Sequence, residues 1–284
     1  MARFKLVLAF LAFVIFAAGA GGAYYFWKKF IVPDTVVTRH IEGSAEVPRE
    51  KPDLGKRHFD DAIQLLRDGE MLAARDRLLY LMEYYPESKT FEDAKRIVGE
   101  VNMDLLISKI PIEGKAEHMV KRGEALLTIA RRSKTTIDYI MRANGKTTAL
   151  IFPDEAITVF PLAYTTEIDL GKKKLLVLDG DKFFKEYDIL DTNLPVGLSA
   201  PVSTSISEKV AWFNDKPINF QDQNYLDCQK WIRSGKMGLF IRHVMPDDAG
   251  RKKPFGVMVS KPDLEELFTI LRNGTGVKLV DSSQ

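Results

Sequence analysis

The hydrophobic periodicity of the chain changes along its length, and this change limits the fold more than any other feature. Between Lys56 and Ser108 the apolar residues recur at the spacing of one face of an α-helix. From Tyr164 onward, short apolar or alternating runs are separated by turns of the Asp-Gly type, a pattern that predicts strands. Because one element type cannot satisfy both patterns, we predict a multi-domain α+β protein.

Composition narrows the class of protein and of partner. Hydrophobic residues make up 45% of the 284 residues, which is ordinary for globular domains. The formal net charge is only +2, so nucleic acid is not an expected partner. Cys228 is the single cysteine and the four histidines are scattered, so we predict no disulfide, no metal site and no cofactor.

Residues 1–30 predict a transmembrane or signal anchor. From Leu6 to Trp27 the chain carries no charge for about 22 residues, roughly 33 Å as a helix, which is enough to cross a bilayer. The run ends in aromatic residues followed by Lys28 and Lys29, as at a headgroup layer. A cleaved signal peptide with its cleavage site near Ala20 is the alternative. Both place the rest of the chain outside the cytoplasm.

Residues 31–55 predict a linker, and residues 56–112 predict helical hairpins. The linker is polar, contains several prolines and has no sustained period. In the hairpins Gly69 separates the first helix from the second, and Tyr85-Pro86 ends the second. The pattern resembles tetratricopeptide-type hairpins. Two alternatives stay open: a spacer packed on itself or on a neighbour, and a surface between 56 and 108 that docks a protein partner.

Residues 116–161 contain a short strand, two short helices and a last strand. The sequence HMVKRGEALLTIARR (118–132) combines a strand, a turn at Gly123 and a first helix. Thr135-Thr136 cap a second helix, Ile137 to Ala143, which ends at Asn144-Gly145. This segment resembles a LysM domain, which implies a strand–helix–helix–strand fold that binds N-acetylglucosamine-containing glycans. We refer to it as the LysM-like segment.

The resemblance to LysM implies a shallow glycan groove between two loops. The residues carried over are Gly123, Glu124, Ala125, Leu126, Ile151, Phe152, Pro153 and Asp154. Two positions depart from the family pattern. Its Gly-Asp-Thr-Leu stands here as Gly-Glu-Ala-Leu, which removes a helix-capping hydroxyl, and its Pro-Gly stands as Pro153-Asp154.

Residues 164–281, the β domain, resemble an L,D-transpeptidase domain of the YkuD-like fold. The resemblance rests on the opening hairpins (166–189), the MGLFIRH run (237–243), the helix from Asp263 and the final NGTGVKL run (273–279). Active members carry Ser-His-Gly-Cys-Ile-Arg before that helix, where this chain has KPFGVM (253–258). Gly256 stands at the cysteine, Pro254 at the histidine and Met258 at the arginine. Glycine has no nucleophile, so the resemblance implies a domain without transpeptidase activity.

Two other residues are candidates for a remaining role. His243 resembles a histidine of the family's strand, either as a packing residue or as a ligand contact. Cys228 has no obvious helix N-terminus or cation to lower its pKa, so we interpret it as a buried small residue rather than a nucleophile.

Together these features predict a membrane-anchored bacterial cell-envelope protein. It is expected to bind peptidoglycan glycan strands without crosslinking them, and a stem peptide is the second expected partner. Two alternatives stay open: an active L,D-transpeptidase that uses Cys228 or an unrecognised residue, and an adaptor that binds a protein through the helical hairpins.

Overall fold

The computed structural model describes residues 24–25, 52–236, 238–244 and 255–283. The chain divides into two units, Met1–Pro52 and Asp53–Gln284, and all elements from α3 onward belong to the second. The predicted anchor, apart from Tyr24 and Tyr25, and the predicted linker up to residue 51 lie outside the described residues. Among the residues that are described, no helix is long and apolar enough to cross a membrane.

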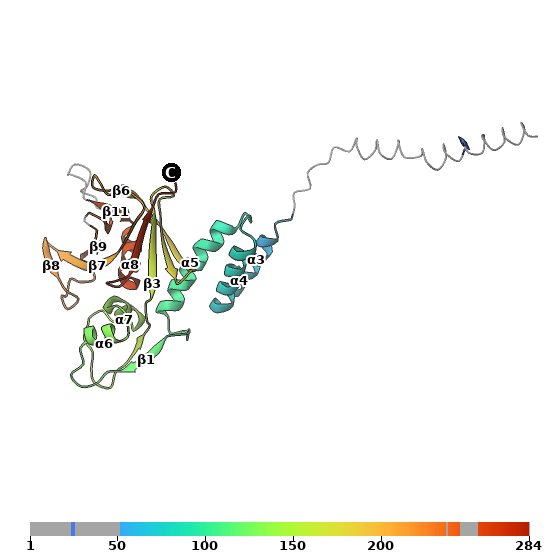
Figure 1. The fold of residues 1–284 in the computed structure, drawn as a ribbon. Coiled ribbons are helices and arrows are strands. Elements are labelled where there is room, and N and C mark those ends of the chain that lie inside the picture. Colours follow the sequence, from blue (N-terminus) through green and yellow to red (C-terminus); the bar gives the residue numbers. More distant parts are fainter. Residues whose placement is uncertain (1–23, 26–51, 237, 245–254, 284) are drawn as a thin grey trace, which may run out of the picture. The chain divides into compact units, whose positions relative to one another are not determined.

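Three helices form the helical hairpins (Figure 1): α3 (Leu54–Arg67), α4 (Met71–Tyr84) and α5 (Phe91–Ile107). α3 begins two residues before the predicted start at 56, because Asp53 caps it by accepting a hydrogen bond from the Lys56 amide at 3.2 Å. Gly69 separates α3 from α4 with a φ of +81°, in agreement with the sequence. A small core joins the helices through Ala62, Leu78, Leu81, Ala94 and Val98.

The last of these helices, α5, packs on the β domain. The Asn102 side-chain amide donates to the Phe184 carbonyl at 2.7 Å. Gly99 allows a close approach, since a Cβ atom there would lie 2.9 Å from Cγ of Lys185. Lys185 in turn pairs with Glu100 at 2.9 Å. These contacts fit a helical spacer that is packed on a neighbour.

The LysM-like segment has the order that its resemblance implies: β1 (Ala116–Met119), α6 (Leu126–Arg132), α7 (Ile137–Ala143) and β2 (Ala156–Val159). β1 and β2 pair antiparallel, with His118 opposite Ile157. Thr136 caps α7 by accepting from the Tyr139 amide at 2.9 Å, and Gly145 follows its end with a φ of +61°. The second helix therefore begins and ends where the sequence predicts.

Within the described residues, the β domain forms one ten-stranded sheet. In sheet order the strands are β5 (Lys182–Asp188), β4 (Lys174–Asp179), β3 (Tyr164–Asp169), β12 (Gly276–Val280), β7 (Val202–Phe213), β9 (Gln229–Ser234), β10 (Phe240–His243), β11 (Gly256–Val259) and β6 (Asp191–Asn193), with β8 (Lys216–Ile218) paired to β7. β3–β12 and β10–β11 are parallel pairs. The sheet curls in Figure 1, and α8 (Lys261–Ile270) packs on β9 and β10.

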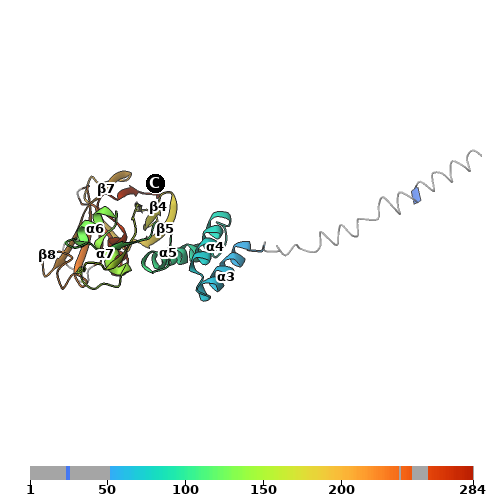
Figure 2. The same cartoon turned by 90° about the horizontal axis from the view of Figure 1, so that it is seen from below.

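The LysM-like segment and the β domain share one hydrophobic core. Tyr139 and Ile140 of α7 belong to the same buried cluster as Leu267 and Phe268 of α8. α7 buries four consecutive residues, Asp138 to Met141, so more than one of its faces is covered. Figure 2 shows α6 and α7 against the β domain. In a helix of only seven residues, the sequence period does not show that a second face is buried. The sequence therefore predicted two separate domains, whereas in the structure the LysM-like segment and the β domain share a core.

Candidate functional site

Glu124 holds the first loop of the predicted glycan groove in place. Its carboxylate accepts a hydrogen bond from the Lys121 amide at 2.9 Å, and it pairs with His118 at 2.8 Å and with Arg132 at 2.9 Å. These bonds, with the one from Lys121 the strongest, lower the pKa of Glu124 from 4.5 to about 2. Because the Glu124 side chain is only 11% exposed, it braces the loop from within.

Glu155 holds the second loop in the same way. It accepts a hydrogen bond from the Phe152 amide at 3.1 Å and pairs with Lys146 at 2.6 Å. The bond from Lys146 holds the pKa of Glu155 below its usual value. Asp154 has a φ of +65°, the left-handed conformation that favours glycine, so glycine would also fit the backbone at this position.

The two loops meet at Val120. Its amide donates to the Glu155 carbonyl at 2.9 Å, and its carbonyl accepts from the Asp154 amide at 2.8 Å. Because Val120 is hydrogen-bonded to residues 154 and 155, the loop that follows Val120 and the loop that contains Asp154 are neighbours. The structure thus places the two segments, 123–126 and 151–154, next to each other, and the groove between them stays a prediction.

The eight predicted groove residues differ in exposure. Those that are exposed are Gly123, Ala125, Phe152, Pro153 and Asp154. Glu124 and Ile151 are half-buried, and the Leu126 side chain is buried in the module core. The sequence analysis omitted Leu150, which is 67% exposed beside Phe152, itself 66% exposed. The sequence could have indicated Leu150 as a groove residue, because it is an apolar side chain in a short loop before a proline.

Ala125 is the N-cap of α6 and makes no side-chain capping hydrogen bond. This agrees with the prediction that the change from threonine removes a capping hydroxyl. α7 keeps such a cap through Thr136.

Gly256, which the sequence analysis aligned with the family's cysteine, leaves no space for a side chain. It lies at the start of β11 with a φ of +128°, a conformation that L-residues rarely adopt. A Cβ atom there would lie 2.5 Å from the Phe240 carbonyl oxygen and 3.0 Å from its Cβ. β11 is paired on both sides, with β10 and with β6, so the backbone cannot shift away freely.

The other degenerate positions lie near this strand or outside the described residues. Met258 is buried in β11, and its carbonyl accepts from the Leu190 amide at 2.8 Å. His243 ends β10, opposite Val259 in the parallel register. Pro254 lies outside the described residues.

Cys228 is 2% exposed, and its thiol donates to the Tyr225 carbonyl at 3.0 Å. Burial raises the pKa of this thiol, Lys230 opposes that shift, and Glu265 and Asp138 add to it. The expectation of no nearby cation was therefore wrong, because Lys230 stands only two residues after Cys228, whereas Asp138 and Glu265 come from distant segments of the chain. The thiol is nevertheless held in its protonated form.

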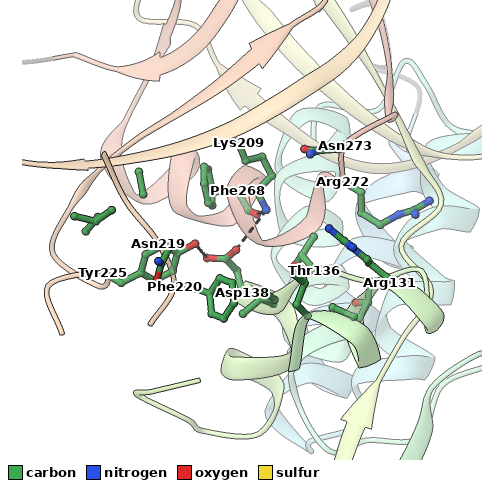
Figure 3. Close-up of a pocket in the computed structure, with 16 residues that line it drawn as sticks. Arg131, Thr136, Asp138, Lys209, Asn219, Phe220, Tyr225, Phe268, Arg272 and Asn273 are labelled. Atoms are coloured by element: carbon green, nitrogen blue, oxygen red, sulfur yellow. Dashed lines mark hydrogen bonds and ion pairs between the residues drawn. The ribbon is translucent and has the colours of Figure 1, made fainter. Parts of the chain in front are cut away.

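A pocket of about 460 Å³ lies where the LysM-like segment meets the β domain (Figure 3). One wall comes from α6, α7 and the turn between them, and the other from β7, β8, α8 and the loops beside them. In Figure 3 Arg131 and Arg272 lie at one end, and Asn219, Phe220 and Tyr225 at the other. The sequence analysis missed this pocket, because its residues are separated by long stretches of chain.

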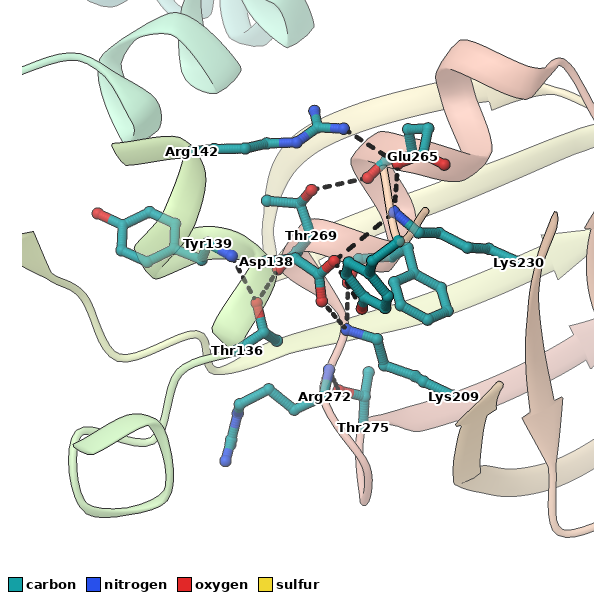
Figure 4. A network of polar contacts seen from close by, with 12 residues as sticks. Thr136, Asp138, Tyr139, Arg142, Lys209, Lys230, Glu265, Thr269, Arg272 and Thr275 are labelled. Carbon is teal, nitrogen blue, oxygen red and sulfur yellow. Dashed lines mark hydrogen bonds and ion pairs between the residues drawn. The ribbon is translucent and has the colours of Figure 1, made fainter. Parts of the chain in front are cut away.

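A network of charged side chains, two of which line the pocket, joins its two walls (Figure 4). Asp138 of α7 lies 3.4 Å from Nζ of Lys209 and 3.7 Å from Nζ of Lys230, and it accepts from the Tyr225 hydroxyl at 3.0 Å. Glu265 of α8 pairs with Lys230 at 2.7 Å. Arg142 of α7 joins Glu265 at 3.3 Å. Burial lowers the pKa of Lys209, with Asp138 acting against that shift.

No group of three histidine, cysteine, aspartate or glutamate side chains that could hold a metal ion occurs in the described part of the chain.

Comparison with known proteins identifies the LysM-like segment. Residues 118–160 match the family model of the LysM domain, as the sequence predicted. Among curated proteins, the chain is 23% identical over 210 residues to cytochrome P450 monooxygenase claJ of Penicillium crustosum. That match covers 68% of this chain and 47% of the relative, so the chain spans less than half of its length. An identity this low does not place the chain in that family.

Solved structures similar to the chain include L,D-transpeptidases. One is the L,D-transpeptidase (Yku) of Stackebrandtia nassauensis, at 15% identity and a TM-score of 0.31, covering 43% of this chain and 58% of that one. Another is a mutant L,D-transpeptidase of Enterococcus faecium, at 18% identity and a TM-score of 0.29, covering 41% and 49%. L,D-transpeptidase 1 of Mycobacterium tuberculosis has 10% identity and a TM-score of 0.29, covering 44% and 66%.

Proposed function

We propose that this chain binds the glycan strands of peptidoglycan through its LysM-like segment and does not crosslink them. The observation that carries the binding part is the LysM family match over residues 118–160. The two loops at Val120 support it, because each is braced by its own carboxylate and needs little ordering when a ligand binds.

The exposed apolar residues of the second loop support a glycan as the ligand. Phe152 and Leu150 are about two-thirds exposed on a loop that Glu155 holds in place. Packing in the core of the LysM-like segment therefore does not explain why these two residues are apolar. An aromatic ring offers a flat apolar face for the C–H face of a sugar ring, and exposed backbone at Gly123 and Ala125 allows close approach. Phe152 belongs to one side of the groove that the family resemblance implies, and Gly123 and Ala125 belong to the other.

The geometry at Gly256 supports the absence of crosslinking. The residue offers no nucleophile, and the 2.5 Å approach to the Phe240 carbonyl leaves no place for one. Cys228 does not replace it, because its buried thiol has a raised pKa and donates to a backbone carbonyl. The β domain is then a structural or recognition domain, and a stem peptide is a possible ligand of it.

The apolar run from Leu6 to Trp27 supports a location in the cell envelope, with an anchor in the membrane. This location gives the LysM-like segment access to the wall. Secretion after signal cleavage gives the same access without an anchor.

The test is sedimentation with purified sacculi. The wild-type chain is expected to sediment with the wall, and Phe152→Ala is expected to bind about tenfold more weakly, the effect of losing about 1.4 kcal/mol. Tyr84→Ala is the matched control, since Tyr84 is an exposed aromatic residue of α4, outside the groove. If Phe152→Ala and wild type were retained equally, the predicted groove would not be the glycan-binding site.

A second candidate function is protein docking through the helical hairpins. It is favoured by an aromatic cluster in which the His58 ring centroid lies 5.0 Å from that of Tyr80, and that of Tyr80 lies 4.6 Å from that of Tyr84. Tyr80 and Tyr84 are exposed. This function predicts that purified chain is not retained on sacculi unless a partner protein is added.

A further inference from the structure

We propose that the pocket between the LysM-like segment and the β domain binds a short peptide through its free terminal carboxylate. This site uses other residues than the glycan groove, so it does not depend on glycan binding. The inference rests on the charge around the pocket, on one unsatisfied hydroxyl and on the character of its walls.

Positive charge is in excess around the pocket. The buried Asp138 and the half-buried Glu265 are carboxylates of the junction, and they already pair with Lys209, Lys230 and Arg142. At the other end Arg131 and Arg272 line the pocket, and among the described residues neither forms an ion pair. An anionic group that enters here meets cations without a competing carboxylate beside them.

The bonds of Arg272 fix its position and leave part of its guanidinium group available. Its Nε donates to the Leu162 carbonyl at 2.6 Å, and its backbone amide donates to the Thr275 hydroxyl at 3.1 Å. The first bond ties the loop between α8 and β12 to Leu162, directly after the LysM-like segment, and the second bond lies within that loop. Among the described residues the two terminal nitrogens of Arg272 make no hydrogen bond or ion pair, and a carboxylate is their preferred acceptor.

One buried hydroxyl in the pocket lacks a partner. Thr135 lines the pocket, is 7% exposed, and its Oγ1 makes no hydrogen bond. Its neighbour Thr136 is satisfied by the Tyr139 amide and by the Thr269 carbonyl. Because a buried hydroxyl without a partner costs free energy, a ligand that accepts from or donates to Thr135 would gain from filling this place.

The walls and the size favour a peptide over a bare anion. Apolar side chains line much of the pocket, among them Leu127, Ile137, Ile218, Phe220 and Phe268. Asn219 and Asn273 add amide groups that pair with peptide N–H and C=O groups. A volume of about 460 Å³ is far larger than an inorganic ion needs and is within the range of small-ligand sites.

A peptide carboxylate has two sources, the wall stem peptide and a protein C-terminus. The shared chemistry is a carboxylate next to a small apolar residue. Stem peptides end in D-residues and proteins end in L-residues, so the two forms of one dipeptide separate these sources.

The experiment is a ligand-observed NMR titration of the full-length chain in detergent. The probes are N-acetyl-Ala-Ala in its L,L and D,D forms, each beside the same peptide with a terminal amide. At least one acid form is expected to bind, and its amide about tenfold more weakly. No binding of either acid form at about 10 mM, or equal binding of acid and amide, would overturn the proposal.

Two variants assign the binding to the pocket. Arg131→Gln is expected to weaken binding of the acid form about tenfold, because it removes one exposed cation of the rim. Lys134→Gln removes the same charge in the turn after α6, from an exposed residue outside the pocket lining, and is expected to leave binding unchanged. Equal loss in both variants would point to general charge attraction and contradict the site.

Sacculus retention separates this proposal from the proposed function. Arg131→Gln is expected to sediment with sacculi as wild type does, because the glycan groove does not include this residue. If wild type is not retained but the dipeptide binds, glycan binding fails and the pocket stands.

Discussion

Two positions depart from their family patterns, and the structure treats them in opposite ways. At Asp154 a non-glycine residue adopts a φ of +65° and keeps the turn for which the family uses glycine. At Gly256, which the sequence analysis aligned with the family's cysteine, the glycine has a φ of +128° and a carbonyl oxygen 2.5 Å from where a Cβ would lie. The backbone at residue 154 carries a side chain, and the backbone at residue 256 leaves no space for one. A sequence difference alone does not distinguish these cases.

Asp154 lies in the LysM-like segment and Gly256 in the β domain. The largest expected effect tests whether the charged contacts between these two parts stabilise the fold. Asp138→Ala leaves Lys209 and Lys230 near each other without their shared carboxylate, and should lower the free energy of unfolding by about 3–5 kcal/mol. Chemical denaturation measures it. Glu208→Ala, which breaks an exposed pair with Arg233, should cost less than about 1 kcal/mol. Similar losses in both variants would mean that the junction does not hold the modules together.

Gly256→Ala tests directly whether there is space for a side chain at residue 256. A methyl group there meets the Phe240 carbonyl in a strained conformation, so we expect a loss of about 3 kcal/mol or more in unfolding free energy. Gly274→Ala is the matched control, because Gly274 has a φ of +88° with nothing within 4 Å of an added Cβ. It should cost about 1 kcal/mol, the strain alone. Equal costs would show that the space at Gly256 is open.

The fold was predictable where the information is local. The caps of α7, the turn at Gly69 and the strands after Tyr164 follow from residues within a few positions of one another. The charged junction was not predictable, because Asp138 and Lys209 lie 71 residues apart and each resembles an ordinary surface charge. At Gly256 the sequence indicated a missing thiol, but the clash with Phe240 depends on the pairing of two strands.

A smaller effect concerns acid stability of the first groove loop. The pKa of Glu124 is lower in the folded chain than its usual 4.5, so its carboxylate stabilises the fold above pH 4.5. That contribution is lost as the pH falls from 4.5 toward about 2. Glu124→Gln should therefore lower Tm at pH 7 and differ less from wild type near pH 2. Glu117→Gln, an exposed carboxylate of β1, is the control, and a Tm gap for Glu124→Gln that does not narrow in acid would contradict the brace.

Asp154→Gly should have the smallest effect. Glycine relieves the left-handed strain of Asp154 but makes the unfolded chain more flexible, so the two terms nearly cancel, within about 0.5 kcal/mol. Retention on sacculi should also be unchanged. Asp154→Val, a β-branched residue at the same φ, is expected to be clearly less stable. A large loss in Asp154→Gly would mean that the carboxylate has a role beyond the turn.

Our central proposal is that this chain binds peptidoglycan and does not form or exchange its peptide crosslinks. The most direct test incubates the chain with sacculi and a labelled donor tetrapeptide, and measures both sedimented protein and label joined to the wall. We predict that the chain sediments and that the label stays in solution. Label joined to the wall, and abolished by alkylation of Cys228, would contradict the account.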